Sequence, residues 1–130
     1  MNAEDIMNTP IVAASARAFA REVASYMLMG GFSGVPVADR DGSLIGIVTE
    51  IDLIRAVRDG KSLETTRIGD IMTRDVITVD VSTSMEEIME ILDSERILRV
   101  PVMRDGVVVG IVSRPDVIRA AVEPELMRLG

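Results

Sequence analysis

Two stretches of the chain carry apolar residues every three or four positions, and this spacing predicts one amphipathic helix in each stretch. The positions are Phe19, Val23 and Met27 in the first stretch, and Met85, Ile88 and Leu92 in the second. Thr83 is followed by Glu86 three residues later, which is the N-cap signature expected at the start of the second helix.

Each predicted helix is followed by two apolar runs with Asp-Gly between them, a strong short-range signal for a β-hairpin. The runs are Val35–Ala38 with Leu44–Val48, and Val100–Met103 with Val107–Val112. Short extended segments precede the helices at Ile11–Ala14 and Val76–Val79, and further helices begin near Thr49 and Ser113. The pattern therefore predicts the element order β-α-β-β-α twice.

The two sets of elements are copies of one sequence. Asp5–Met7 returns as Asp70–Met72, and Gly46–Thr49 returns as Gly110–Ser113 with Ser in place of Thr. Because separate blocks keep one register, they are internal repeats. We assign copy one to residues 4–58, a linker to 59–68, copy two to 69–122 and a C-terminal tail to 123–130. A copy of about 55 residues has little core of its own, so we expect one module over residues 1–130.

The amino-acid composition limits the kinds of functional site that this chain can form. With 48% hydrophobic and 27% charged residues, the chain has a globular composition. It contains no Cys and no His, which excludes thiol nucleophiles, zinc clusters and Ser-His-Asp triads. The net charge of −7 disfavours nucleic acid, and no apolar run is long enough to span a membrane. We expect a cytoplasmic protein without a catalytic or metal site.

Gly46–Asp52 and Gly110–Asp116 share the form Gly-h-h-[Ser/Thr]-x-x-Asp, where h is apolar. The Gly allows another group close to the backbone, the hydroxyl falls at a helix N-cap, and the Asp follows one turn later. Ser or Thr with an acid three residues on is also a plain helix cap. However, a helix N-terminus attracts phosphate, and an Asp beside it can accept hydrogen bonds from a ribose diol. The spacing alone leaves both interpretations open.

Together with Val35–Val37, Val100–Val102, the hairpins and the Ile-Met lead-ins, the motif resembles the cystathionine-β-synthase (CBS) domain family in its paired form, the Bateman module. The resemblance spans nearly the whole chain. It implies an α/β (α+β) fold in which two CBS motifs pack sheet to sheet about a pseudo-twofold axis and leave two clefts. Many members bind adenine derivatives there, namely AMP, ADP, ATP, S-adenosylmethionine or NAD. Paired CBS motifs commonly form homodimers through their helices, so the resemblance implies a homodimer.

Carried over by position, the resemblance implies a ligand site in each cleft. The motif 2 cleft would use Ile77, Thr78, Arg99, Val100, Pro101, Ser113, Arg114 and Asp116. The motif 1 cleft would use Val12, Ala13, Gly34, Val35, Pro36, Thr49 and Asp52. In these sets the Asp holds the ribose, the Ser or Thr approaches the phosphate, and the remaining strand residues lie against the adenine.

The copies differ in charge at this site. Arg99 and Arg114 of copy two correspond to Gly34 and Glu50 of copy one. Because a guanidinium binds phosphate well, we expect the motif 2 cleft to bind an anionic nucleotide more tightly.

We therefore expect a regulatory, energy-sensing module and not an enzyme. It would bind an adenine nucleotide or another adenosyl ligand as its regulatory ligand, require no cofactor, and act on an effector protein or on its own oligomeric state. The alternative is a ligand-free dimerisation scaffold whose Thr/Ser-x-x-Asp motifs serve only as helix caps.

Overall fold

The computed structural model describes residues 1–129, with side chains described through residue 122. The chain forms two compact units. The motif 1 unit is Val12–Val76, and the motif 2 unit combines Met1–Ile11 with Ile77–Gly130. Each unit is a mixed α/β structure with a small sheet and helices, as the sequence predicted.

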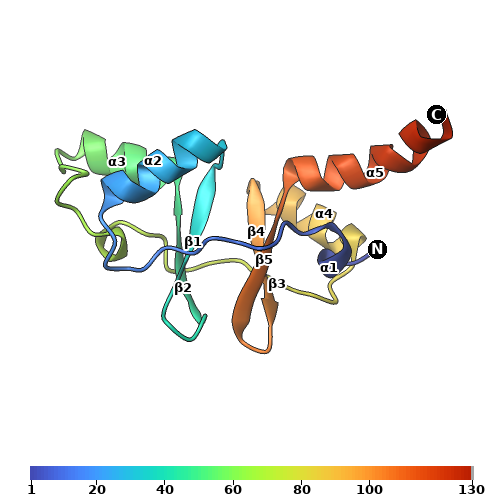
Figure 1. Cartoon of the computed structure of the whole chain (residues 1–130), viewed down its shortest axis with the longest axis horizontal. Helices are drawn as coiled ribbons and strands as arrows, with labels where there is room; N and C mark the ends of the chain where they lie inside the picture. Colours follow the sequence, from blue (N-terminus) through green and yellow to red (C-terminus); the bar gives the residue numbers. More distant parts are fainter. Residues whose placement is uncertain (130) are drawn as a thin grey trace. The chain divides into compact units, whose positions relative to one another are not determined.

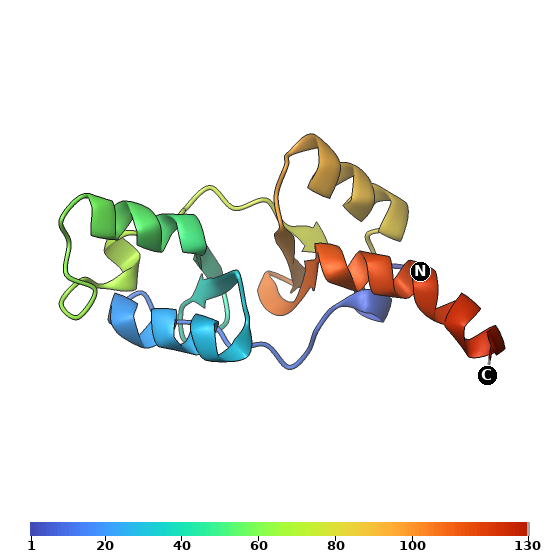
Figure 2. The same cartoon turned by 90° about the horizontal axis from the view of Figure 1, so that it is seen from above.

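The motif 1 unit is built around one hairpin. Its elements are α2 (Ala20–Gly30), β1 (Gly34–Ala38), β2 (Leu44–Thr49), α3 (Glu50–Arg58) and the 3-10 helix η1 (Ile68–Asp70). Strands β1 and β2 are antiparallel, and α2 and α3 run side by side in both views (Figures 1 and 2). The expected strand before α2 is reduced to a single parallel bridge between Ala14 and Val37. Val23 and Met27 of α2 are buried, which confirms two of the three positions predicted for the buried face. The third, Phe19, is the N-cap of α2 and is 37% exposed, so its predicted place on that face was wrong.

The motif 2 unit repeats this plan with a fuller sheet. Its elements are α1 (Ala3–Ile6), β3 (Val79–Asp80), α4 (Met85–Ser94), β4 (Arg99–Arg104), β5 (Val107–Ser113) and α5 (Arg114–Leu129). Strand β3 pairs with β4 in parallel and β4 with β5 in antiparallel orientation, and α4 and α5 lie side by side (Figures 1 and 2). Asp105 and Gly106 both have positive φ, as the tight hairpin turn requires.

One cap differs from its prediction. Helix α4 is capped by Ser84, whose hydroxyl accepts a hydrogen bond from the backbone N–H of Glu87 at 3.1 Å. Thr83, the expected cap, instead accepts a hydrogen bond from the N–H of Asp80 at 3.0 Å. The expectation was wrong by one residue because Thr83 closes the turn after β3, and the next residue is then free to start the helix.

The two lead-in segments are exchanged between the repeats. Asn8, which follows the lead-in of copy one, forms a bridge with Ile111 of copy two. Thr73, which follows the lead-in of copy two, forms the equivalent bridge with Ile47 of copy one, with both N···O distances 2.8 Å. The compact units are therefore offset from the sequence repeats, and each hairpin is completed by the lead-in of the other copy.

Candidate functional site

The motif of copy one lies where β2 passes into α3, with Thr49 at the N-cap of α3 as expected. Both the backbone N–H and the hydroxyl of Thr49 donate to Oδ2 of Asp52, at 2.9 and 3.0 Å. The hydroxyl of Thr73 donates to Oδ1 of the same carboxylate at 3.0 Å. Asp52 is only 6% exposed, so these contacts replace the water that a carboxylate needs.

The motif of copy two repeats the hydrogen bonds between the hydroxyl residue and the Asp, and two further side chains donate to the same carboxylate. The N–H and hydroxyl of Ser113 donate to Oδ2 of Asp116, each at 2.7 Å. The side-chain amide of Asn8 donates to the same oxygen at 2.7 Å, and the guanidinium of Arg119 donates to Oδ1 at 3.0 Å. Asp116 is 5% exposed. Its Oδ2 accepts three hydrogen bonds, more than the two lone pairs of a carboxylate oxygen ordinarily serve.

Burial and hydrogen bonding act in opposite directions on the carboxyl of Asp116. Burial raises its pKa, but hydrogen bonds from Ser113, Asn8 and Arg119 outweigh burial and hold the pKa below its ordinary value. The carboxylate is therefore a fully charged acceptor at neutral pH.

Each motif Gly is contacted by a lead-in segment. A Cβ added at Gly46 would lie 2.7 Å from Sδ of Met72 and 2.9 Å from the carbonyl oxygen of Thr73. A Cβ at Gly110 would collide with Met7, whose Cγ would be 2.9 Å away. The prediction that another group approaches these glycines is thus confirmed, and that group is protein.

The hairpin register brings most of the predicted site residues together. Gly34 pairs with Thr49, and Arg99 pairs with Ser113. Seven of the predicted residues are buried: Gly34, Val35, Pro36, Asp52, Val100, Pro101 and Asp116. The segments predicted to contact adenine are exposed: Val12 with Ala13, and Ile77 with Thr78. Their role in ligand binding stays a prediction.

Arg114 has a position that its sequence context did not indicate. Its Nε donates to the carbonyl oxygen of Ile97 at 2.9 Å, and its side chain lines a groove between α4 and α5. The cation that contacts the motif carboxylate is Arg119, one turn further along α5.

Asn8 and Thr73 are the site residues that sequence reasoning missed. Both directly follow the Ile-Met of a lead-in, so they occupy the same position of the repeat. Each donates a hydrogen bond to the motif Asp of the other copy. Their equivalent positions in the repeat could have marked both residues as candidates. The sequence could not indicate that each one contacts the Asp of the other copy.

The assembled features match one family. The family model for the CBS domain matches residues 3–59 and again residues 68–123. The chain belongs to the CBS domain family. It is a tandem CBS pair, and its motif Gly, hydroxyl and Asp residues fall at corresponding places in the two domains.

Curated relatives include a CBS domain-containing protein and an enzyme. The chain is 40% identical over 93 residues to "CBS domain-containing protein CBSX3, mitochondrial" of Arabidopsis thaliana, covering 67% of this chain and 45% of that protein. It is 37% identical over 86 residues to an inosine-5'-monophosphate dehydrogenase of Nitrosopumilus maritimus, covering 65% of this chain and 17% of the enzyme. The chain thus spans less than half the length of these relatives.

Solved structures of CBS pairs share the fold. The CBS domain pair of protein MJ0100, in complex with 5-methylthioadenosine and S-adenosyl-L-methionine, matches with a TM-score of 0.85 and 29% identity over 95% of this chain and 98% of that one. CBSX2 in complex with AMP matches with a TM-score of 0.85 and 26% identity over 95% and 98% of the two chains. Among residues 1–129 of the present chain, no helix is both long and apolar enough to cross a bilayer.

Proposed function

We propose that this CBS pair is a regulatory module that binds an adenine nucleotide or another adenosyl ligand and acts on a partner protein or on its own oligomeric state. The observation that carries the proposal is the duplicated motif. In both units a hydroxyl at a helix N-terminus stands beside a buried Asp side chain, with the paired β-strand next to it. Phosphate is favoured at such a helix end, and a carboxylate suits a ribose diol.

The related CBS pairs support the class of ligand. One carries AMP, and another carries 5-methylthioadenosine and S-adenosyl-L-methionine. All three molecules share the adenosyl group and differ in charge beyond the ribose. We infer that the adenosyl part is the common recognition element here, with the charge of the remainder setting the preference.

A second candidate function rests on a specific observation. The carboxylates of Asp52 and Asp116 already accept hydrogen bonds from their own chain, so both also act as helix caps. A scaffold without a ligand would need nothing more from these residues. A ligand that binds Asp116 must share or displace the contacts of Asn8 or Arg119.

Calorimetric titration with AMP, ATP and S-adenosylmethionine separates the two candidates. The double variant Thr49→Val/Ser113→Ala removes both hydroxyls but keeps the backbone donors to the Asp residues. We expect wild type to bind at least one ligand and the variant to bind it at least about ten-fold more weakly, since a hydrogen bond to a charged group is worth about 1.5–3 kcal/mol.

The matched control is Thr65→Val, which removes an exposed hydroxyl outside both motifs. It should bind like wild type. Absence of binding for all three ligands, with the chain shown to be folded, would favour the scaffold.

A further inference from the structure

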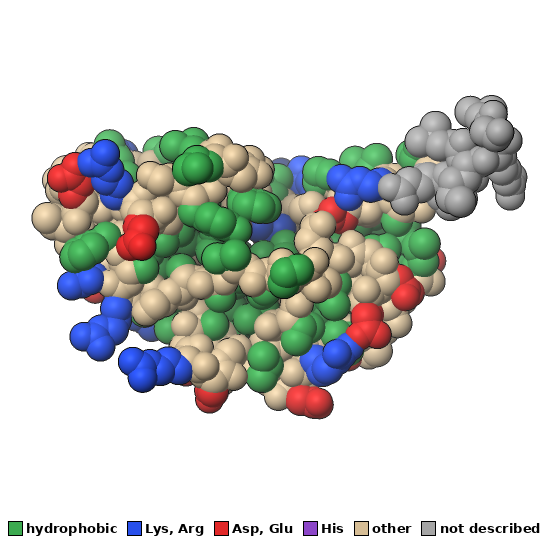
Figure 3. All heavy atoms as spheres, viewed as in Figure 1, with side chains coloured by type: hydrophobic (Ala, Val, Ile, Leu, Met, Phe, Trp, Pro, Cys, Tyr) green, Lys and Arg blue, Asp and Glu red, His purple; other side chains and the backbone are tan. Residues whose placement is uncertain are grey.

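A groove runs between α4 and α5 of the motif 2 unit. It has a volume of about 350 Å³, and its apolar wall is formed by Met89, Leu92, Val117 and Ile118. Met89 is 40% exposed and Ile118 is 63% exposed, so much of this wall faces solvent. Exposed hydrophobic side chains are also spread over the face of the molecule in Figure 3, so apolar surface alone does not single out a site.

Two guanidinium groups distinguish this groove. Arg96, two residues after the end of α4, and Arg114, the first residue of α5, both line it. Their repeat equivalents in copy one are Gly31 and Glu50, so the corresponding groove between α2 and α3 has neither of these cations. Among the residues with described side chains, Asp93 is the only acidic one that lines the α4/α5 groove. The groove therefore combines an apolar wall with a net positive charge.

The backbone at Arg96 has an unfavourable conformation for an arginine. Its φ is 53°, in the left-handed region that residues with a Cβ rarely adopt. Gly31, at the same place after α2, has a φ of 68°, and glycine is the usual residue at this helix-ending position. Copy two thus holds an arginine where local stability favours the glycine of copy one. Backbone strain of this kind is found where a side chain serves a binding site.

Arg114 is held at the same end of the groove. Its backbone N–H donates to the carbonyl oxygen of Leu98 at 3.1 Å, and its Nε donates to that of Ile97 at 2.9 Å. Because Ile97 directly follows Arg96, these contacts bring the base of the Arg114 guanidinium to the segment that carries Arg96. Both cations are therefore positioned where α4 ends and α5 begins.

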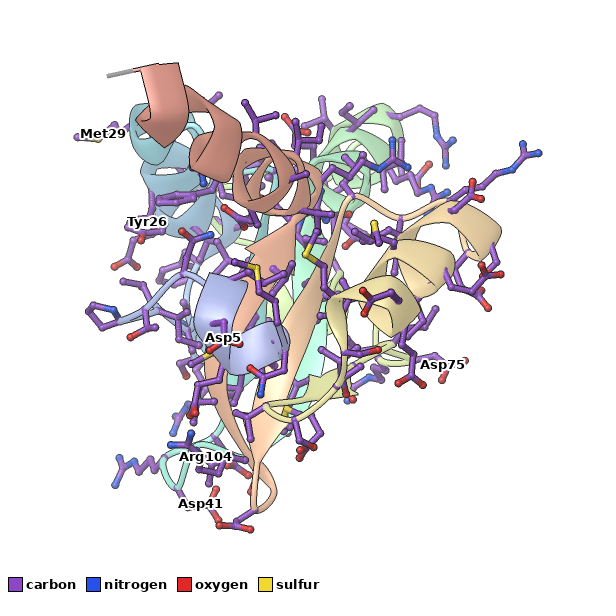
Figure 4. The ribbon with its side chains drawn as sticks, turned by 90° about the vertical axis from the view of Figure 1, so that its right-hand side faces the viewer. Asp5, Tyr26, Met29, Asp41, Asp75 and Arg104 are labelled. Atoms are coloured by element: carbon purple, nitrogen blue, oxygen red, sulfur yellow. The ribbon has the colours of Figure 1, made fainter. Side chains whose placement is uncertain are left out.

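Neither of these two arginines is neutralised by a partner. Arg96 and Arg114 form no ion pair with any residue whose side chain is described. Arg104 of the same unit is different, because it pairs with Glu4 and lies at the tip of the β4–β5 hairpin, away from α5 (Figure 4). The positive charge at the groove is thus available to an anion.

We propose that the α4/α5 groove binds a fatty carboxylate, with the acyl chain along the apolar wall and the carboxylate held by Arg96 and Arg114. A guanidinium is planar and matches the two oxygens of a carboxylate with parallel hydrogen bonds. The volume is near the lower end of the range of about 300–1,000 Å³ for ligand pockets, which suits one short acyl chain better than a two-chain lipid. The inference goes beyond the proposed adenosyl function, because Ser113 and Asp116 do not line this groove.

An NMR titration of the ¹⁵N-labelled chain tests the ligand class and the location together. Octanoate is compared with 1-octanol, which has the chain without the charge, and with acetate, which has the charge without the chain. We expect octanoate to shift the amide signals of residues 92–98 and 114–118 along a saturating curve, and the other two probes to leave them in place. Equal effects of octanoate and 1-octanol, or shifts confined to α2 and α3, would overturn the proposal.

Two variants test the cations. Arg96→Asn keeps a polar residue that tolerates the left-handed backbone, so it should bind octanoate at least about ten-fold more weakly while melting no lower than wild type. Loss of binding in this variant could not then be a loss of folding. Arg114→Gln should weaken binding in the same direction, because it removes the second charge.

The matched control is Arg55→Gln, which removes an exposed arginine of α3 that does not line the α4/α5 groove. It should bind octanoate like wild type. Unchanged octanoate affinity in Arg96→Asn, or equal weakening in Arg55→Gln, would show that general charge attraction is responsible and would remove the site.

The outcome is separable from that of the adenosyl proposal. A groove that another protein chain covers in solution would admit no octanoate, and absence of any shift would overturn the inference. A chain that binds octanoate but none of AMP, ATP and S-adenosylmethionine would leave this inference standing while the proposed adenosyl function fails. Binding of AMP without octanoate would have the reverse meaning.

Discussion

Asp116→Asn should destabilise the protein more than the same change at Asp52. At Asp116 four donor groups converge on a buried carboxylate, and one donor, Arg119, can never accept a hydrogen bond. In either orientation of the amide in Asp116→Asn, its NH2 group therefore points at another hydrogen-bond donor. At Asp52 the hydroxyl of Thr73 can turn and accept from an amide instead.

The magnitude follows from the hydrogen bonds that an amide at position 116 cannot make. Two or three hydrogen bonds at about 1 kcal/mol each give a destabilisation of about 2–3 kcal/mol for Asp116→Asn, against about 1 kcal/mol or less for Asp52→Asn. In a chain of this size about 1 kcal/mol moves the melting temperature by about 3–5 °C, so the first variant should melt about 10 °C lower. This exceeds the cost of about 1 kcal/mol typical for removing a simple cap.

Urea unfolding at two pH values completes the assay. The pKa of Asp116 is lowered in the folded state, so its contribution is present above the unfolded pKa of about 3.9 and is lost as pH falls through the folded pKa. The stability gap between wild type and Asp116→Asn should therefore be full at pH 7 and shrink below about pH 4. Equal destabilisation by the two Asn variants at pH 7, or a gap that persists in strong acid, would refute the reasoning.

Two further predictions concern other contacts. Gly110→Ala should lower the free energy of unfolding by about 1–3 kcal/mol through overpacking. Because Met7 covers Gly110, adding Met7→Ala should relieve part of that loss, whereas the effects of Met7→Ala and Gly46→Ala should simply add. If urea unfolding showed additive effects in both double variants, the lead-in exchange would be contradicted. Asp39 and Asp41 lie in the exposed turn after β1 and shift each other's pKa through one hydrogen bond. This bond is the main reason why the pKa of Asp41 is lowered to about 2 and why the pKa of Asp39 is raised. Asp41→Asn should return the pKa of Asp39 towards its ordinary value in an NMR titration, and an unchanged Asp39 would show that the two carboxyls are independent.

Features governed by neighbours in the chain could be predicted from the sequence. The Asp105–Gly106 turn, the buried face of α2 and the N-cap at Thr49 all depend on residues within a few positions of one another. The repeat register also indicated the CBS pair, since two copies of one motif can be compared without any structure. The cap of α4 was missed by one residue because two adjacent hydroxyls, Thr83 and Ser84, compete for one role.

Only the tertiary structure decided how the repeats are completed. Asn8 and Asp116 are 108 positions apart, and no local propensity indicates that the lead-in of one copy donates to the motif of the other. Thr73 and Asp52 make the same exchange in reverse. The hydrogen bond from Arg114 to the carbonyl oxygen of Ile97, between α4 and β4, likewise depends on tertiary packing. A buried carboxylate is stable only when hydrogen-bond donors contact it, and the backbone at each motif Gly is buried only when another segment packs on it. Which segment does so is decided by tertiary packing and not by the residues near the motif in the sequence.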